Sequence, residues 1–421
     1  MSKVETYEPG GEVFVGLDIG TTKVCCVAAV LNSAGELDII GVGNAQSFGM
    51  RRGVMVDMQL NTRSIELAVE ECQQMAGCRI EWAHVGIAGG HVHSQNSHGM
   101  VAVADKETKK VTEEDKKRAI AAAMVVNIPV ERELIQCVPQ DYALDNLTGI
   151  ADPLNMMGVR LEVNVHIITG AVFAIANIVR CVGVSGLNTK NIILESLASA
   201  EAVLTPQEME VGAAILDIGG GTTDIAVFHE GMVKHSAVIA LGGDSLTSDL
   251  VVGLKTDSGV AERLKITDGC CVQGMLETNA PIEVPSMGGV SLEKVERSFF
   301  CDILEKRCEE ILTHAQNEIR NAKLEDKVHQ IVLTGGSSLL RGLPELTYQI
   351  FNRPARQGYP HCQGGLANLV NDPKYSTAIG LILYGIRHPE SGLQIGKNEN
   401  SGASLFGKIW SHLKNMLLLG S

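Results

Sequence analysis

Two stretches of the chain place an aspartate, glycines and hydroxyl residues in the same order. The first is Asp18-Ile19-Gly20-Thr21-Thr22-Lys23, and the second is Asp217-Ile218-Gly219-Gly220-Gly221-Thr222-Thr223. Glycine lets a turn adopt positive φ and lets a ligand approach the backbone closely, and successive N–H groups in such a turn bind anions. An aspartate at a strand end suits hydrated Mg²⁺, because that ion keeps several waters and takes few carboxylates. Together the two stretches predict a site for the phosphate chain of a nucleotide, with Mg²⁺ held through water by Asp18 and Asp217.

Each stretch lies between two apolar runs. Phe14–Leu17 leads into Val24–Leu31, and Ala213–Leu216 leads into Ile225–Phe228. This pattern predicts a buried strand, a tight turn and a second strand in both places. Two such hairpins, about half a chain apart, predict two related α/β halves that close on one nucleotide.

The segments between and after the hairpins predict further helices and strands. Residues 89–166 predict a small α+β insertion, in which Thr112 caps a helix and Asp115 occupies the capping-box position. Asn191–Glu195 is expected to be a strand and Ser199–Leu204 a helix. A long helix is expected over Leu292–Ala322.

Composition limits the class of protein. The chain has 421 residues, 45% of them hydrophobic, which is enough for more than one globular domain. Its net charge of −14 argues against nucleic acid as a partner. The eleven cysteines contain no CxxC motif, so we expect reduced, buried thiols. No run reaches the roughly 20 apolar residues that a membrane-spanning helix needs.

Five glycine-bearing segments follow one another along the chain. Their order resembles that of the actin, Hsp70 and sugar-kinase superfamily, in which two α/β domains close over ATP. The resemblance implies an α/β, actin-like (ribonuclease-H-like) duplicated two-domain ATP clamp. The segments are Asp18–Lys23, Glu195–Ala200, Asp217–Asp224, Gly335–Leu340 and Ser376–Gly380.

The resemblance also implies roles for single residues. Asp18, Asp217 and Glu195 are the expected catalytic residues, with Glu195 in the first segment that connects the domains. Glu262 and Lys265 match the pair that contacts adenosine in the Hsp70-like branch, although such a pair is more often a solvated helix pair. The ATP-binding residues implied are Gly20, Thr21, Thr22, Lys23, Gly219, Gly220, Gly221, Thr222, Thr223, Gly242, Gly243, Glu262, Lys265, Gly335, Gly336 and Ser337.

Within the superfamily the chain is similar, over nearly its whole length, to the FtsA family of bacterial cell-division proteins. The similarity is carried by Val15–Lys23, Leu216–Ala226, Ile331–Gly336 and Tyr375–Leu381. The insertion falls where this family places its own subdomain. The domains implied are an actin-like domain I core (1–88 and 167–198), the insertion (89–166), domain II (199–387), a flexible linker (388–404) and an amphipathic helix (405–421).

The last residues predict a helix that lies in a membrane interface. At about 100° per residue, its apolar side chains fall within an arc of roughly 140°. Lys408 and Lys414 lie on the opposite side, which suits an anionic lipid surface. The alternative is a helix that docks back on the body. The apolar arc consists of Leu405, Phe406, Ile409, Trp410, Leu413, Met416 and Leu417.

The FtsA resemblance implies a partner peptide at the long helix. Ser291–Glu310 alternates basic and apolar residues, which alone is typical of an amphipathic helix with a solvated charged face. FtsA-like proteins bind the C-terminal peptide of FtsZ near the start of this helix, and Arg297 and Arg307 stand at matching positions. These two arginines are therefore the expected peptide contacts.

Taken together, the resemblance implies a cell-division protein that binds ATP and Mg²⁺, forms filaments with itself and attaches to inner-membrane lipids. It would anchor the FtsZ ring to the cytoplasmic face of the bacterial inner membrane at the division site. Other division proteins would bind residues 89–166. ATP would act mainly as a conformational ligand, with at most slow hydrolysis. The alternatives are a small-molecule kinase of the same fold, which leaves the amphipathic tail unexplained, and an Hsp70-type chaperone, which would need a further β-rich domain.

Overall fold

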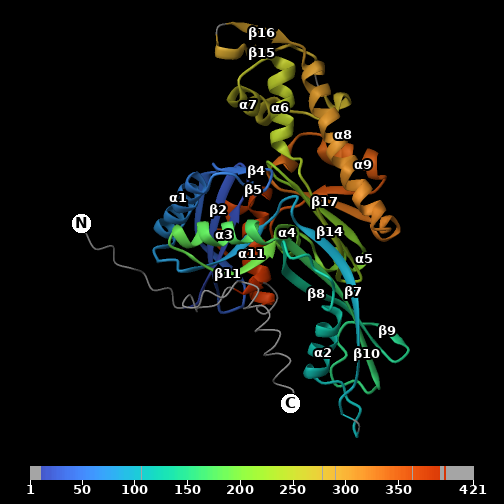
Figure 1. Cartoon of the computed structure of the whole chain (residues 1–421). Helices are drawn as coiled ribbons and strands as arrows, with labels where there is room; N and C mark the ends of the chain where they lie inside the picture. The colour runs from blue at the N-terminus through green and yellow to red at the C-terminus, as the bar shows by residue number, and fades with distance from the viewer. Residues whose placement is uncertain are drawn as a thin grey trace, which may run out of the picture.

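The computed structural model describes residues 11–105, 107–276, 278–289, 291–362, 364–388 and 393–394. The predicted membrane helix, 405–421, lies outside the described residues, as does most of the predicted linker. Two α/β domains stand side by side, and a smaller subdomain projects from each of them (Figure 1). The expected fold class, a duplicated actin-like clamp with an insertion in its first half, is confirmed. None of the described helices combines the length and apolarity needed to cross a bilayer.

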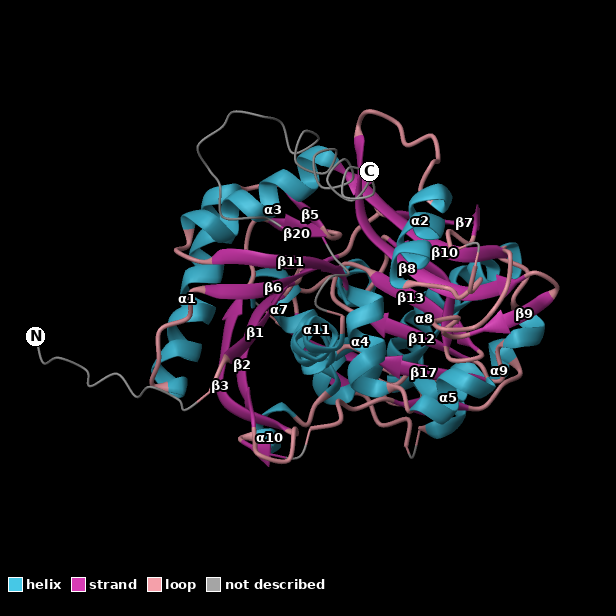
Figure 2. Ribbon diagram, turned by 90° about the horizontal axis from the view of Figure 1, so that it is seen from below, coloured by secondary structure: helices cyan, strands magenta, loops and turns pink. Residues whose placement is uncertain are grey.

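Domain I is built on a seven-stranded sheet in the order β19-β3-β2-β1-β6-β11-β20. Helices α1 (Met58–Ala76) and α3 (Val172–Val184) cover one face, and α11 (Ser376–Arg387) covers the other (Figure 2). Apolar side chains from both faces form the largest core of the molecule. The strands are β1 (Val13–Ile19), β2 (Lys23–Leu31), β3 (Leu37–Gln46), β6 (Trp82–Ile87), β11 (Asn188–Leu194), β19 (Gly364–Gly365) and β20 (Leu393–Gln394).

Domain II repeats the central part of this arrangement in a five-stranded sheet, β14-β13-β12-β17-β18. In each domain an antiparallel hairpin lies beside a parallel neighbour: β1–β2 beside β6, and β12–β13 beside β17. Asp18 faces Cys25 in the first hairpin, and Asp217 faces Asp224 in the second. The strands of this sheet are β12 (Ala213–Ile218), β13 (Thr223–His229), β14 (Met232–Ile239), β17 (Gln330–Thr334) and β18 (Ala355–Gln357).

The inserted subdomain has its own sheet and core. Strands β7 (His93–Ala102), β10 (Arg160–Ala171), β8 (Arg132–Leu144) and β9 (Leu147–Ile150) pair in that order. Helix α2 (Glu113–Ala123) packs on them around an apolar cluster that is separate from the other two cores. Thr112 caps α2, and Asp115 completes the capping box, as the sequence predicts.

Two helices connect the domains. Helix α4 (Glu195–Val203) leads from β11 towards domain II, and α11 returns to domain I. They cross so closely that a Cβ on Gly380 would lie 1.8 Å from the carbonyl oxygen of Ala198. Glycine at position 380 is therefore required by backbone contact between the helices.

The smaller subdomain of domain II carries helices and a two-stranded hairpin. Helices α6 (Gly243–Leu254), α7 (Ser258–Asp268) and α8 (Arg297–Asn321) share a core with the five-stranded sheet. The remaining elements are β4 (Met50–Arg51), β5 (Val54–Met55), α5 (Pro206–Val211), β15 (Ile282–Pro285), β16 (Leu292–Val295), α9 (Leu343–Phe351), α10 (Ala367–Val370) and 3₁₀ turns at Gln273–Met275, Met287–Gly289, Glu325–Lys327, Gly336–Leu339 and Pro373–Tyr375.

Three expectations about element boundaries were wrong. The long helix begins at Arg297 and not at Leu292, because Leu292–Val295 pairs with Ile282–Pro285 as a strand. Helix α4 begins four residues earlier than expected, at Glu195. Leu393–Gln394, inside the range predicted as a linker, pairs with β11 at the edge of the domain I sheet. A neighbouring hairpin strand decides the first case, and a strand pairing far away in sequence decides the last.

Gly380→Ala tests the helix crossing. We expect it to lower the free energy of unfolding by roughly 1–3 kcal/mol or more, because a methyl group forced into a filled contact costs about that much. Gly183→Ala on α3 is the matched control, since a Cβ there meets no atom within 4 Å, and it should be neutral or stabilising by up to about 1 kcal/mol. Urea denaturation of both variants measures the difference. Equal stability of Gly380→Ala and the wild type would contradict the crossing.

Candidate functional site

The tips of the two hairpins meet across the cleft between the domains. A Cβ on Gly220 would lie 2.4 Å from Cγ2 of Thr22, and a Cβ on Gly221 would lie 2.3 Å from Oγ1 of Thr21. The backbones of the two loops therefore lie against the opposing threonines. A small cavity beside the tips is lined by Ile19, Gly20, Thr21, Met50, Gly53, Gly86, Ile87, Ala88, Ile178, Glu195 and Thr222.

Four carboxylates interact at the hairpins, and one of them, Glu195, lines this cavity. Asp18, Asp217 and Asp224 are buried, and Glu195 is partly buried. Burial, and then repulsion from Asp18, raises the pKa of Glu195 well above its usual range. Burial, and then repulsion from Asp217, does the same to the pKa of Asp224. Like charges held together away from water favour the neutral, protonated forms. A bound cation would relieve this repulsion, so the cluster suits a cation as ligand.

Hydroxyl groups from both connecting helices hold Asp217. Ser199 on α4 donates to Oδ2 of Asp217, and Thr377 on α11 donates to the same oxygen at 3.1 Å. Burial is nevertheless the larger influence and raises the pKa of Asp217 to about 6. The second hairpin is thus fixed to the two helices that join the domains.

Lys23 partly offsets the negative charge of Asp18 in the first hairpin. Its Nζ lies 3.5 Å from Oδ2 of Asp18 and donates to the carbonyl oxygen of Lys374, which precedes α11. Burial still raises the pKa of Asp18, although Lys23 opposes the shift. One lysine therefore does not neutralise the cluster.

The donor set fits a hydrated Mg²⁺ better than a directly bound ion. Within the described ranges, no three His, Cys, Asp or Glu side chains converge closely enough to hold a metal ion. Oδ1 of Asp224 is buried without a hydrogen-bond partner, while Oδ2 accepts from Thr222 at 2.9 Å. An orphaned carboxylate oxygen suits a water in the shell of Mg²⁺. Asp18, Asp217 and Asp224 are the residues that could hold it.

Domain II forms a wall of the cleft behind the second hairpin. The amide of Gly243 donates to the carbonyl oxygen of Gly219 at 2.9 Å, and Oγ of Ser337 donates to the same oxygen at 2.9 Å. Lys265 on α7 donates to the carbonyl oxygen of Gly243 at 3.0 Å and lies 2.7 Å from Glu262. These residues, all expected from sequence to bind ATP, thus lie behind the second hairpin. Glu262 and Lys265 form a pair on one helix, but Lys265 is largely buried and also bonds Gly243, so the pair is not the solvated one of the alternative interpretation.

Gly335 closes this wall for a steric reason. Its φ is +82°, and a Cβ would lie 2.3 Å from Oδ1 of Asp217. A side chain here would strain the backbone and displace the carboxylate. The strand-ending glycine predicted from sequence is therefore also a packing partner of Asp217.

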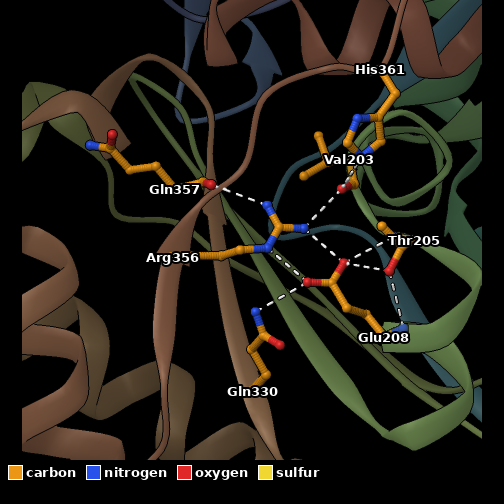
Figure 3. Close-up of polar contacts among 7 residues, drawn as sticks. All are labelled: Val203, Thr205, Glu208, Gln330, Arg356, Gln357 and His361. Atoms are coloured by element: carbon orange, nitrogen blue, oxygen red, sulfur yellow. Dashed lines mark hydrogen bonds and ion pairs between the residues drawn. The ribbon is translucent and has the colours of Figure 1, made fainter.

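An arginine–glutamate pair fixes the far end of α4 (Figure 3). Nε and Nη2 of Arg356, on β18, each lie 2.7 Å from a carboxylate oxygen of Glu208, on α5. Nη2 of Arg356 also donates to the carbonyl oxygen of Val203 at 3.1 Å. His361 lies 3.1 Å from that same carbonyl through Nε2. Helix α4 therefore ends rigidly on domain II while its first residue, Glu195, lies in the cleft.

The two expected peptide-binding arginines lie outside this cleft, on α8. Arg297 pairs with Asp268 of α7 at 3.0 Å, and its Nε is buried without a partner. Arg307 pairs with Asp249 of α6 at 2.6 Å. Both guanidinium groups are therefore already engaged with the helices next to α8.

Sequence reasoning missed several contributors to the cleft. Asp224 had a signal, since it closes the second glycine-rich stretch and its partner in the hairpin is Asp217. Ser199 and Thr377 lie in segments singled out for glycines and small residues, and no local pattern shows that they meet Asp217. The carbonyl of Lys374 carries no sequence signal at all.

Comparison with known proteins gives a consistent family. The family model described as "Cell division protein FtsA" matches residues 214–380, and that described as "SHS2 domain inserted in FTSA" matches residues 89–169. The cell division protein FtsA of Pseudomonas aeruginosa is 42% identical over 395 residues, which are 94% of this chain and 94% of that protein.

Two solved structures share the fold at low identity. The PilM–PilN type IV pilus biogenesis complex superposes with a TM-score of 0.65 at 16% identity, covering 89% of this chain and 98% of the other. MreB5 of Spiroplasma citri bound to ADP gives a TM-score of 0.52 at 16% identity, covering 90% and 100%. At these identities the likeness establishes the architecture alone.

Asp217→Asn tests the cost of a buried carboxylate charge in the cleft. Because the pKa of Asp217 is raised to about 6, its contribution to stability is full below about pH 4 and is lost as the pH rises through about 6. In nucleotide-free protein the variant should therefore raise the free energy of unfolding by roughly 1–3 kcal/mol at about pH 8, and by almost nothing at about pH 4.

Urea denaturation at the two pH values measures this difference. Asp326→Asn, at an exposed position, is the control and should change stability little at either pH. An Asp217→Asn protein that gains no stability at the higher pH would show that the four carboxylates do not oppose folding.

Proposed function

The chain belongs to the FtsA family of cell division proteins, and from this premise we propose that it is an ATP-binding, actin-like protein that polymerises on the cytoplasmic membrane and anchors the FtsZ ring there. The observation that carries the proposal is the carboxylate cluster between two duplicated hairpins. A site that gathers negative charge from both domains binds Mg²⁺ and polyphosphate together more readily than either alone. Family membership favours this function over the small-molecule kinase.

In this proposal the nucleotide lies between the two hairpins. The loops Gly20–Lys23 and Gly219–Thr223 cradle the phosphates, and Asp18 and Asp217 hold Mg²⁺ through water. Gly242, Gly243, Glu262, Lys265 and Gly335–Ser337 surround the adenosine. Support comes from their convergence behind the second hairpin and from the related fold of MreB5, whose structure contains ADP.

ATP acts in this account mainly as a conformational ligand. Its phosphates, bound together with Mg²⁺, would contact both hairpins, and the cation would offset the charge of carboxylates that come from both domains, so binding favours the closed arrangement of the hairpins. Mg²⁺ would supply charge neutralisation of the phosphates when bound. Glu195 orients a water beside the terminal phosphate, and its raised pKa allows it to hold or release a proton there.

We propose that the chain works in the units predicted from sequence: domain I (1–88 and 167–198), the insertion (89–166), domain II (199–387), a linker (388–404) in which Leu393–Gln394 pairs with β11, and a membrane helix (405–421). We assign lipid contact to the apolar arc from Leu405 to Leu417, and contacts with other division proteins to the insertion. The protein then resides on the cytoplasmic face of the inner membrane at the division site. One short amphipathic helix binds weakly, whereas many in one filament bind with high avidity.

The C-terminal peptide of FtsZ is assigned to the start of α8. Arg297 and Arg307 provide the positive charge, and the half-exposed Phe299 provides an apolar contact between them. A carboxylate of the peptide would compete with Asp268 for Arg297 and with Asp249 for Arg307. Such exchange costs little, because the incoming pair replaces an existing pair.

Liposome flotation tests the coupling between nucleotide and membrane. ATP with Mg²⁺ should raise the liposome-bound fraction of the full chain by about tenfold or more, because filaments multiply the number of tails. Deletion of residues 405–421 should abolish binding while light scattering still reports ATP-dependent assembly. Liposome binding that is equally strong without nucleotide would contradict the coupling.

Peptide titration tests the α8 site. Arg297→Glu combined with Arg307→Glu should weaken binding of the FtsZ C-terminal peptide by at least about tenfold, or about 1.4 kcal/mol. Lys306→Glu is the control, since Lys306 lies on the same helix, is exposed and pairs only locally with Glu309 among the described contacts. Unchanged affinity in the double variant, or an equal loss in the control, would remove the two arginines from the site.

A further inference from the structure

One buried side chain of the inserted subdomain reaches the nucleotide cleft. Gln136 on β8 is 1% exposed, and its Oε1 accepts a hydrogen bond from the amide of Leu194 at 2.7 Å. Leu194 ends β11 and immediately precedes Glu195, the first residue of α4. The contact therefore joins residues 58 apart in sequence, and it holds the backbone next to a carboxylate of the cleft.

A break in strand register aims Gln136 at this amide. Gln136 faces Ile168 on β10, but Leu134 faces the next residue, Thr169, so Ile135 is an extra residue on β8. Bulges of this kind re-aim side chains and occur next to functional sites. In a regular strand neighbouring side chains point to opposite faces, whereas Ile135 and Gln136 are both buried. The register break thus lies directly beside the residue through which the insertion bonds β11.

The start of α4 depends on this contact. Leu194 is the N-cap residue of α4 and provides no side-chain cap. Glu195 packs against β6, where a Cβ on Gly86 would lie 3.0 Å from Cγ of Glu195. Gln136 and β6 thus constrain the position from which Glu195 enters the cleft.

The insertion also forms hydrogen bonds with domain II. Asn96 on β7 donates to the carbonyl oxygen of Lys234 at 3.0 Å, and Gln140 on β8 donates to that of Val233 at 2.6 Å. His166, whose pKa is lowered to about 3 by burial, lies 2.8 Å from Oγ of Ser236. All three contacts fall on β14, which leads into Gly242 and Gly243 at the wall that domain II forms behind the second hairpin.

We propose that Gln136 is a positioning residue for Glu195, and that through it the inserted subdomain senses and adjusts the nucleotide cleft. The insertion touches domain I beside Glu195 and domain II along β14, so it spans the two sides of the clamp. A protein that binds the insertion and shifts it would move Glu195. This inference rests on the proposed nucleotide function. Because coupling between two sites is reciprocal, nucleotide binding must also alter the insertion.

Hydrogen exchange measured by mass spectrometry tests the proposal on the full chain. Gln136→Leu removes the acceptor at nearly constant size. Gln140→Leu, on the same strand and also buried, removes the contact with Val233 of β14 and a longer one with Asn96 of β7, but no contact with β11, and serves as the matched control. In nucleotide-free protein, Gln136→Leu should speed exchange of residues 190–200 by about tenfold and leave β14 unchanged, because local opening follows the lost contact. Gln140→Leu should do the reverse.

The second readout is reciprocal coupling. MgATP should slow exchange in residues 133–137 of the wild type and of Gln140→Leu, but not of Gln136→Leu. The proposal is overturned if MgATP leaves residues 133–137 of the wild type unchanged, or if both variants loosen the same segments. A wild type that binds no MgATP would instead contradict the nucleotide function, and the nucleotide-free comparison of the two variants would still decide the role of Gln136.

Discussion

Mutual repulsion among four carboxylates is the constraint on which this structure depends. Asp18 comes from the first hairpin, Asp217 and Asp224 from the second, and Glu195 from the helix between the domains. Burial raises the pKa of all four, repulsion from neighbouring carboxylates raises the pKa of Glu195, Asp217 and Asp224 further, and Lys23 offsets only part of the charge. A folded protein keeps such a cluster when a ligand uses it, because buried like charges oppose folding. The arrangement therefore makes closure of the two domains sensitive to a cation that carries phosphate.

The helix α4 transmits that sensitivity. Its first residue lies in the cleft, its Ser199 holds Asp217, and its last residue is fixed by Arg356 and His361 of domain II (Figure 3). Its backbone also touches α11 at the crossing with Gly380. A change in the position of the carboxylates thus acts on one rigid element that contacts both domains. The inserted subdomain adds a third connection through Gln136 and β14, which places the surface available to partners within reach of the cleft.

The sequence predicted the fold and the two hairpins because these depend on local signals. An apolar run followed by Asp-Ile-Gly and hydroxyl residues encodes a strand and turn within a dozen residues, and the capping box at Thr112 is equally local. The start of α4 and the Gln136 contact depend on partners tens of residues away, and strand β16 depends on its hairpin partner β15, so periodicity alone could not locate them. Helix α5 is different: Thr205-Pro206-Gln207-Glu208 is a capping box with proline at the first position, a signal that was present and was not used.

Magnesium dependence of nucleotide binding tests the central claim most directly. Calorimetric titration of the full chain with ATP, in Mg²⁺ and in excess chelator, compares the cluster with and without its expected cation. Leaving buried charge uncompensated costs roughly 3–5 kcal/mol, so removal of Mg²⁺ should weaken binding by roughly 100-fold or more. Equal affinity for ATP in chelator would show that the four carboxylates are not the element that links nucleotide binding to closure of the clamp.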